Sequence, residues 1–220
     1  MRQTPGEIER GSMAIIDAEL LARGIRLEGE NAAVIRRCIH ASADFDYAEN
    51  LRFTPGAVTR GIEALQKGGV IVTDTNMALA GLSRPCLARL KASARCYMAE
   101  EETASLSRQL GGTRAEASVE RAAAEFPEAV YAVGNAPTAL LRLADKLEAG
   151  LRPALIVAVP VGFVNVVESK ERIWEACRRL HLPCIAAMGR KGGSSIAAAV
   201  CNALLYLAAD CLEPEKRGWG

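Results

Sequence analysis

From Val70 onward, short apolar segments alternate with segments of helical periodicity, and this rhythm constrains the fold more than any other feature. Each apolar segment is continuous rather than alternating with polar residues, which is typical of strands buried on both faces. The segments are GVIVTD (69–74), RCYMA (95–99), AVYAVG (129–134), ALIVAVP (154–160) and PCIAAMG (183–189). The pattern predicts an α/β fold with a doubly wound parallel sheet and helices on both faces.

Residues 1–69 show no clear strand, and we expect them to form a mainly helical lead-in to an α/β core at residues 70–208. Helical patterns cover residues 7–22, 30–41 and 56–67 in the lead-in, and residues 113–126, 137–150, 169–181 and 194–209 in the core. The chain has 220 residues, half of them hydrophobic, and no internal repeat. A single domain over residues 1–220 is the simplest interpretation.

Composition argues against several classes of function. The formal net charge is +1 at pH 7, so no global field favours nucleic acid or a membrane surface. The start of the chain has no secretory pattern, and no apolar run is long enough to span a bilayer. The seven cysteines form no CxxC pair, so we expect buried thiols in a reducing, cytoplasmic compartment. No spacing of histidines and cysteines fits a metal site.

The ends of the predicted strands carry residues suited to ligand binding, because ligands in such sheets bind beyond the carboxyl ends of the strands. Asp74 follows the first strand, Asn135 lies in GNAPT (134–138), and Gly162 and Phe163 lie in VPVGFVN (159–165). Phe163 has two open readings: it packs on a flat ligand ring, or it belongs to the core. Asn135 suits a helix cap, with Pro137 in the first turn.

The loop GRKGGSS (189–195) is the strongest candidate among these strand ends. Gly192 and Gly193 allow close approach of the backbone, and Ser194 or Ser195 suits the cap of the next helix. Arg190 and Lys191 would lie at the positive end of that helix dipole, which favours an anionic guest. An ordinary strand–helix turn with solvated basic residues is the alternative, and the order of residues is not that of a Walker A loop.

A second basic residue is predicted at a helix start. Thr113 and Glu116 form a T-x-x-E capping box, which places Arg114 in the first turn. A cation is disfavoured there unless it holds a carboxylate, although a plain surface arginine is the alternative.

His40 is the candidate acid–base group, and it shares a helix face with Arg37 beside the apolar stripe of the helix. An imidazole near an arginine and a carboxylate can exchange protons near neutral pH, but a capping or core histidine is the more usual explanation of such a residue. Asp44 and Asp46 would either orient His40 or bind elsewhere. His181 lies at the end of a predicted helix, where the helix dipole favours a cation.

Several motifs in combination resemble the precorrin-8 methylmutase family over residues 12–207. They are RxxHASADFDYAENLRF, TDTNMALAG, GGTRA, GNAPTAL, PVGFVNVVESK and GRKGGSSIAAAVCNALLY. Within the family, ADFDY and GRKGGS are more similar to the cobalt-precorrin branch than to the aerobic one.

The resemblance implies a flavodoxin-like fold and an isomerase of cobalamin biosynthesis, which moves a methyl group from C-11 to C-12 on ring C of a corrinoid. It implies no organic cofactor, with any cobalt carried by the substrate. The histidine matching His40 is the proton donor and acceptor, and the residues matching Ser12 and Arg37 contact the substrate. Family members form homodimers with sites near the interface, and handover of product to neighbouring pathway enzymes is a further expectation.

A macrocycle fringed with carboxylates needs several separate anion sites, which the basic residues Arg37, Arg114, Arg190 and Lys191 would supply. We also expect substrate contacts from the loop residues Asp74, Thr113, Asn135, Gly162, Phe163, Gly192, Gly193 and Ser194. Two alternatives remain at this point: a non-catalytic corrinoid carrier, and a flavodoxin-like phosphate or nucleotide binder.

Overall fold

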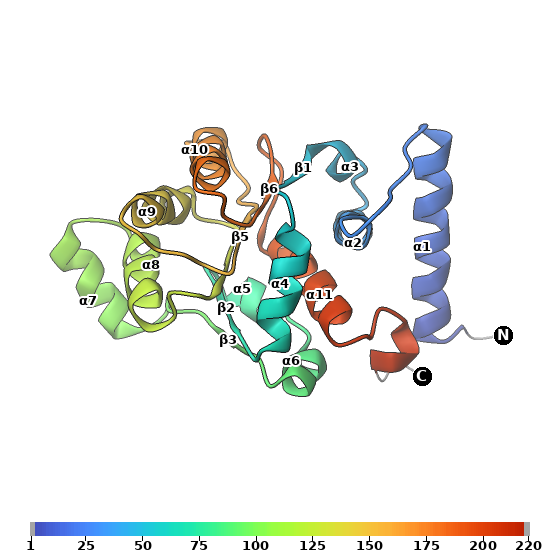
Figure 1. The fold of residues 1–220 in the computed structure, drawn as a ribbon, viewed down its shortest axis with the longest axis horizontal. Coiled ribbons are helices and arrows are strands. Elements are labelled where there is room, and N and C mark those ends of the chain that lie inside the picture. Colours follow the sequence, from blue (N-terminus) through green and yellow to red (C-terminus); the bar gives the residue numbers. More distant parts are fainter. Residues whose placement is uncertain (1–2, 218–220) are drawn as a thin grey trace.

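The computed structural model describes residues 3–217 and contains a six-stranded sheet with helices on both faces (Figure 1). The strand order is β1-β6-β5-β4-β2-β3. All neighbouring pairs are parallel except β1 with β6. The strands are β1 (Leu51–Phe53), β2 (Val70–Thr73), β3 (Ser93–Arg95), β4 (Val130–Val133), β5 (Leu155–Ala158) and β6 (Cys184–Ala187). The predicted α/β class and the mainly parallel sheet are confirmed.

Two strand predictions were wrong, and both concern edge strands. β1 lies in the lead-in that we expected to lack strands, and its Leu51 pairs antiparallel with Ala187 of β6. Its three residues are too few to show a periodicity, and only the neighbouring β6 holds them extended. At the other edge, β3 ends at Arg95, so most of the predicted segment 95–99 is not strand.

One face of the sheet is covered by helices from both ends of the chain. These are α1 (Pro5–Ala22), α2 (Ala32–Ser42), α4 (Ala57–Gln66), α5 (Asn76–Ala80), α6 (Arg84–Leu90) and α11 (Ser194–Ala208). α11 is apolar and buried around most of its circumference, so it forms the centre of this layer. α2 packs against α11, and α1 packs outside α2 (Figure 1).

The opposite face is covered by α8 (Arg114–Glu125), α9 (Pro137–Glu148) and α10 (Val166–Arg179), with α7 (Glu101–Leu110) packed on α8. The short α3 (Tyr47–Asn50) precedes β1, and the 3-10 helix η1 (Pro214–Arg217) lies against α1. The seven predicted helices are present with ends that differ by a few residues, because amphipathic periodicity is a strong signal while caps are a weak one. The short α3, α5, α6 and η1, and α7, were not predicted.

The cysteines are mostly buried, as the apolar runs that contain them predict. Six are buried and Cys96 is partly exposed, and all seven are free. Within residues 3–217, every helix is too short or too polar to cross a membrane.

Candidate active site

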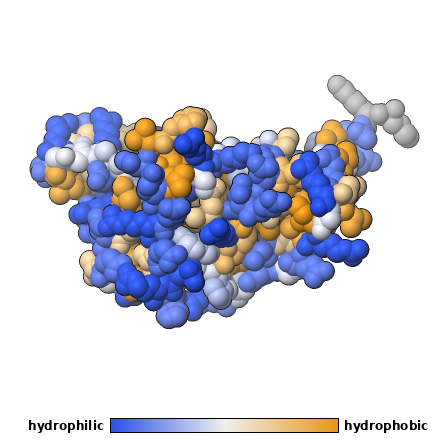
Figure 2. Space-filling model, turned by 90° about the horizontal axis from the view of Figure 1, so that it is seen from above, coloured by the Kyte–Doolittle hydropathy of each residue, from blue (hydrophilic) through white to orange (hydrophobic). Residues whose placement is uncertain are grey.

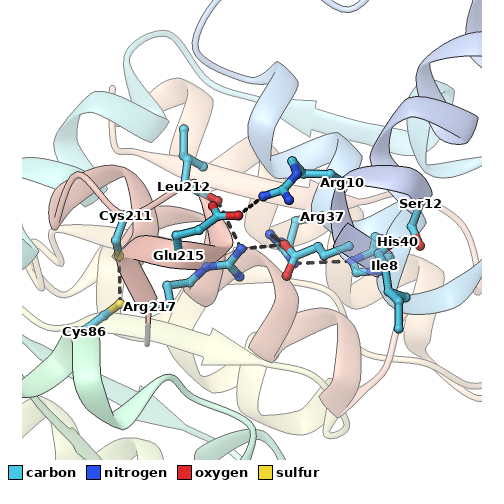
Figure 3. A network of polar contacts seen from close by, with 11 residues as sticks. Ile8, Arg10, Ser12, Arg37, His40, Cys86, Cys211, Leu212, Glu215 and Arg217 are labelled. Atoms are coloured by element: carbon cyan, nitrogen blue, oxygen red, sulfur yellow. Dashed lines mark hydrogen bonds and ion pairs between the residues drawn. The ribbon is translucent and has the colours of Figure 1, made fainter. Parts of the chain in front are cut away.

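His40 lies in the last turn of α2 and is half-buried between α2 and α1 (Figure 3). α2 buries Val34, Ile35, Cys38 and Ile39, so its apolar face fixes the helix on α11 and turns His40 to the edge of that contact. The helix stops at Ala43, whose backbone is left-handed with a φ of 54°.

The side chain of Arg37, one turn earlier, contacts the ring of His40. The distance between Nη1 of Arg37 and Nδ1 of His40 is 3.3 Å, as the predicted shared face requires. A guanidinium donates hydrogen bonds and accepts none, so Nδ1 is the acceptor and the ring proton sits on Nε2. Burial lowers the pKa of His40, and the charge of Arg37 lowers it further, so both favour the neutral imidazole.

Ser12 lies on α1 beside His40, together with Ile8 (Figure 3). Its hydroxyl donates to the carbonyl oxygen of Ile8 at 2.9 Å, which is the back-bond that serines make inside helices. The oxygen keeps lone pairs for a ligand. Figure 3 draws Ser12, Arg37 and His40 in one region of the molecule, and their contact with a substrate stays a prediction.

Lys191 pairs with the two aspartates that follow His40 in the sequence. Its Nζ lies 2.7 Å from Asp44 Oδ2 and 2.5 Å from Asp46 Oδ2, and these contacts raise the pKa of the lysine. The aspartates thus bind the loop after β6 rather than orient His40, which decides between the two alternatives. The ammonium of Lys191 already has two carboxylates, so its expected role as an anion site is weakened.

Lys170 holds the loop between β6 and α11 through two hydrogen bonds, and the sequence analysis missed this residue. Lys170 is fully buried on α10, and its Nζ donates to the carbonyl oxygens of Gly189 and Lys191, each at 2.8 Å. Burial lowers the pKa of Lys170 to about 8, so the amine is still mostly charged at pH 7. The signal was present as the lysine of PVGFVNVVESK, but nothing in the sequence told us that its side chain points inward.

The two glycines of this loop make a close approach to the protein's own backbone. A Cβ at Gly192 would lie 2.1 Å from the carbonyl oxygen of Val159, to which Gly193 donates its N–H at 2.8 Å. The expected serine cap was wrong: the cap position of α11 is Gly193, without a side-chain hydrogen bond. Ser194 instead shares a hydrogen bond with Thr75 at 2.8 Å, which ties the ends of β2 and β6 together.

Asp74 has a structural role that differs from the expected substrate contact. Its Oδ1 accepts from the backbone N–H of Gly134 at 2.8 Å, and its Oδ2 accepts from Asn135 and Ala136 at 2.7 and 2.8 Å. Burial raises the pKa of Asp74, and these three N–H groups oppose that shift. The carboxylate therefore shapes the GNAPT loop.

Asn135, in that loop, is exposed at the rim of the sheet. The expected cap by Asn135 was wrong, because the cap position of α9 is Ala136 and no side chain bonds the helix start. Pro137 does occupy the first turn, as expected. The side chain of Asn135 is left available to a ligand.

Phe163 is exposed at the rim, with 82% of its surface accessible, which excludes the core alternative. Arg190 lies over its ring, with Cζ 5.6 Å from the centroid. Gly162 donates its N–H to the carbonyl oxygen of Arg190 at 3.2 Å, so the loops after β5 and β6 are joined. The result is an exposed aromatic face beside a cation.

Thr113 and Arg114 lie away from His40 within this chain. They begin α8, which covers the other face of the sheet at the opposite end from α2 (Figure 1). The capping box with Glu116 is confirmed, and Thr113 also contacts Thr138 at 3.0 Å. Arg114 is exposed, so one chain does not bring this pair and His40 into a single site.

Neither of the two cavities described in the structure is lined by His40. The larger, about 760 Å³, lies at the amino ends of the strands and is lined by residues such as Arg60, Glu128 and Arg152. The other, about 480 Å³, lies between α1, α2 and η1, with Glu9 and Arg37 in its lining. Among residues 3–217, no group of His, Cys, Asp and Glu side chains is arranged to hold a metal ion.

Together the fold and this site define a class: an α/β protein with a mostly parallel sheet, a half-buried histidine at the end of one helix, and an exposed aromatic side chain beside an arginine at the rim of the sheet. The precorrin-8X methylmutase family model matches residues 7–207. The cobalt-precorrin-8 methylmutase of Leptospira interrogans is 43% identical, with 91% of this chain and 92% of that protein covered. The precorrin-8X methylmutase of Pseudomonas aeruginosa is 41% identical, covering 90% and 93%.

A solved structure agrees with these relatives. The precorrin-8X methyl mutase of Thermus thermophilus superposes with a TM-score of 0.83 at 39% identity, over 92% of this chain and 98% of that one. The chain belongs to the precorrin-8X methylmutase family and is an isomerase of cobalamin biosynthesis.

Proposed function

We propose that this chain moves a methyl group from C-11 to C-12 on ring C of precorrin-8 or its cobalt form, with His40 as the acid–base group. The observation that carries the proposal is the half-buried imidazole of His40 with Arg37 against its Nδ1. In the migration the bond from the methyl carbon to C-11 breaks while its bond to C-12 forms. No atom enters or leaves the substrate, so we expect no external methyl donor and no organic cofactor.

His40 supplies a proton that weakens the bonding of the methyl group at C-11. Nε2–H donates to the ring C nitrogen or its conjugated system, and the proton returns to Nε2 after the shift, because an isomerisation leaves the composition unchanged. The positive charge of Arg37 favours loss of a proton from the imidazole of His40. It therefore makes Nε2–H of His40 a better proton donor than the N–H of an isolated neutral imidazole.

The macrocycle would lie over the rim formed by the loops after the strands. Numbered among themselves, the five parallel strands follow the order 2-1-3-4-5, which supports a flavodoxin-like fold with its ligand crevice between β2 and β4. Asn135 and Ser194 lie at the ends of these loops. Phe163 would stack on the flat ring while Arg190 meets a carboxylate.

Precorrin-8 with and without cobalt are the two substrates to compare. The residues ADFDY and GRKGGS favour the cobalt form. We expect anaerobic incubation with each substrate to give the spectrum of a methyl-shifted product, faster with the cobalt form. Binding of both without any spectral conversion would point to a carrier instead, and binding of nucleotide alone would contradict both.

We also propose a homodimer with its sites near the interface. Apolar side chains interrupt the hydrophilic surface in Figure 2. On α1, Ile8 and Ile15 are large exposed hydrophobic residues. Such an assembly would give Thr113 and Arg114 of one copy a route to the substrate held by His40 of the other. We expect light scattering to give twice the 23.4 kDa chain mass. A monomer that is fully active would contradict this part of the proposal.

A further inference from the structure

We infer that Glu9 and Arg217 are positioning residues, which hold the guanidinium of Arg37 against Nδ1 of His40 and so keep the ring proton on Nε2. The inference rests on the proposed function only in its last step, where the Nε2 proton serves the methyl migration. The orientation and tautomer of the imidazole can be measured without substrate.

A single buried carboxylate oxygen joins the two guanidiniums. Oε1 of Glu9 accepts from Nη2 of Arg37 at 2.6 Å and from Nη2 of Arg217 at 2.7 Å, and only 5% of Glu9 is exposed. Figure 3 shows Arg217 on one side of Arg37 and His40 on the other. The chain of contacts therefore runs from η1 through α1 to the end of α2.

The ring of Tyr206 on α11 packs against both guanidiniums. Cζ of Arg37 lies 5.0 Å from the ring centroid and Cζ of Arg217 lies 4.4 Å from it. An aromatic face attracts a cation and restricts a flat guanidinium to a plane. Glu9 of α1 and Tyr206 of α11 thus hold the Arg37 side chain of α2, of which 13% is exposed.

The hydrogen bond to Glu9 fixes the orientation of the Arg37 guanidinium. With Nη2 bound to Glu9, Nη1 is the nitrogen that reaches His40. Two guanidiniums over one ring would repel each other without the carboxylate between them. Glu9 therefore offsets one of the two positive charges, and Arg217 prevents Glu9 from turning toward His40, where a carboxylate would favour a proton on Nδ1.

The charges facing His40 come from three elements. Arg37 of its own helix and Arg217 of η1 lower the pKa of His40, while Glu9 of α1 raises it. Tyr206 contributes from α11 through the two arginines. Arg217 lies beyond the part of the chain that the family model matches, residues 7–207. Its bond to Glu9 is therefore not part of the matched region.

The test is Arg217→Gln, read by the ¹⁵N shifts of the imidazole in the free protein. In the unsubstituted protein we expect a pyridine-like Nδ1 and a pyrrole-like Nε2 for His40. In R217Q we expect the two signals to move toward each other and the pKa of His40, from the same titration, to rise. His181, the other histidine of the chain, is exposed beyond α10 and serves as the internal reference.

The matched control is Glu215→Gln, which removes the exposed ion pair with Arg10 at the same contact of η1 with α1. We expect E215Q to leave both imidazole signals unchanged. We expect Arg217→Lys to restore part of the signal pattern, because an ammonium keeps the charge beside Glu9. In turnover, R217Q should lower kcat on the order of 10-fold with a smaller change in KM, the lower end of the range for outer-shell partners of metal-bound histidines.

A double substitution separates positioning from a general effect on the fold. If Arg217 acts through Arg37, R217Q should change the His40 signals strongly in the unsubstituted protein and far less in an Arg37→Gln background. Equal changes in both backgrounds would overturn the inference, as would unchanged His40 signals in a folded R217Q. If R217Q does not fold, Arg37→Gln alone must shift the His40 signals in the same direction, and failure to do so overturns it. Absence of turnover in every protein, with the imidazole signals as expected, would instead reject the proposed function.

Discussion

Replacing His40 with alanine is expected to lower the rate of methyl migration by about 10²–10⁴-fold, the usual contribution of one general acid–base group. The reason is local: among the described residues, the other histidine lies beyond α10, on the opposite face of the sheet, and cannot take over the proton transfer. Binding should persist, because the carboxylates of the macrocycle meet other residues. The measurement is single-turnover spectroscopy, together with a spectral titration of corrinoid binding.

His181→Ala is the matched control for this prediction. It removes the same side chain from an exposed position past the end of α10, so turnover and binding should both stay unchanged. Thermal unfolding of the two variants checks that the half-buried His40 is not needed for the fold. Unimpaired turnover in H40A would end the acid–base assignment.

Replacing Asp74 with alanine is expected to cost roughly 3 kcal/mol in the free energy of unfolding. The substitution leaves three backbone N–H groups of the GNAPT loop without their acceptor, at about 1–3 kcal/mol for each buried group, with sums that are not additive. Part of the cost is offset, because the buried charge of Asp74 is itself unfavourable. Urea unfolding followed by circular dichroism measures the difference.

The free energy of unfolding of Asp74→Asn should lie between that of D74A and that of the unsubstituted protein. An amide keeps one acceptor oxygen but turns its NH₂ toward an N–H donor. Glu171→Gln, an exposed charge on α10, is the control and should stay within about 0.5 kcal/mol of the unsubstituted protein. If D74A unfolds like the control while substrate affinity falls, Asp74 contacts the substrate, as the sequence had suggested, and does not organise the loop.

Local patterns were reliable wherever burial repeats along the chain. The continuous apolar segments at β2, β4, β5 and β6 and the amphipathic helices could be predicted, because each pattern records how one segment meets the core. The contact of Arg37 with His40 also followed from spacing, since residues three apart share a helix face. Strands β1 and β3 failed, because three residues at a sheet edge carry too little pattern.

Partnerships between distant residues could not be predicted in the same way. Lys191 lies in a loop that resembles an anion site. Its ammonium nevertheless pairs with Asp44 and Asp46, which come from a distant part of the sequence. Asp74 looks like a ligand group at a strand end, yet its oxygens are taken by the next loop. In each case the side chain's role depends on which opposite charge or N–H the fold places beside it.

The sequence alone determined the alternation of strands and helices, which loops follow the carboxyl ends of the strands, and the place of His40 with Arg37 on one helical face. Those features depend on neighbours within a few residues, so composition and spacing suffice to predict them. Only the tertiary structure decided that Glu9 and Arg217, 208 positions apart, bond each other, and that the same oxygen of Glu9 also holds Arg37. The energy of such a buried charge network depends on distances and burial that exist only once the chain has folded.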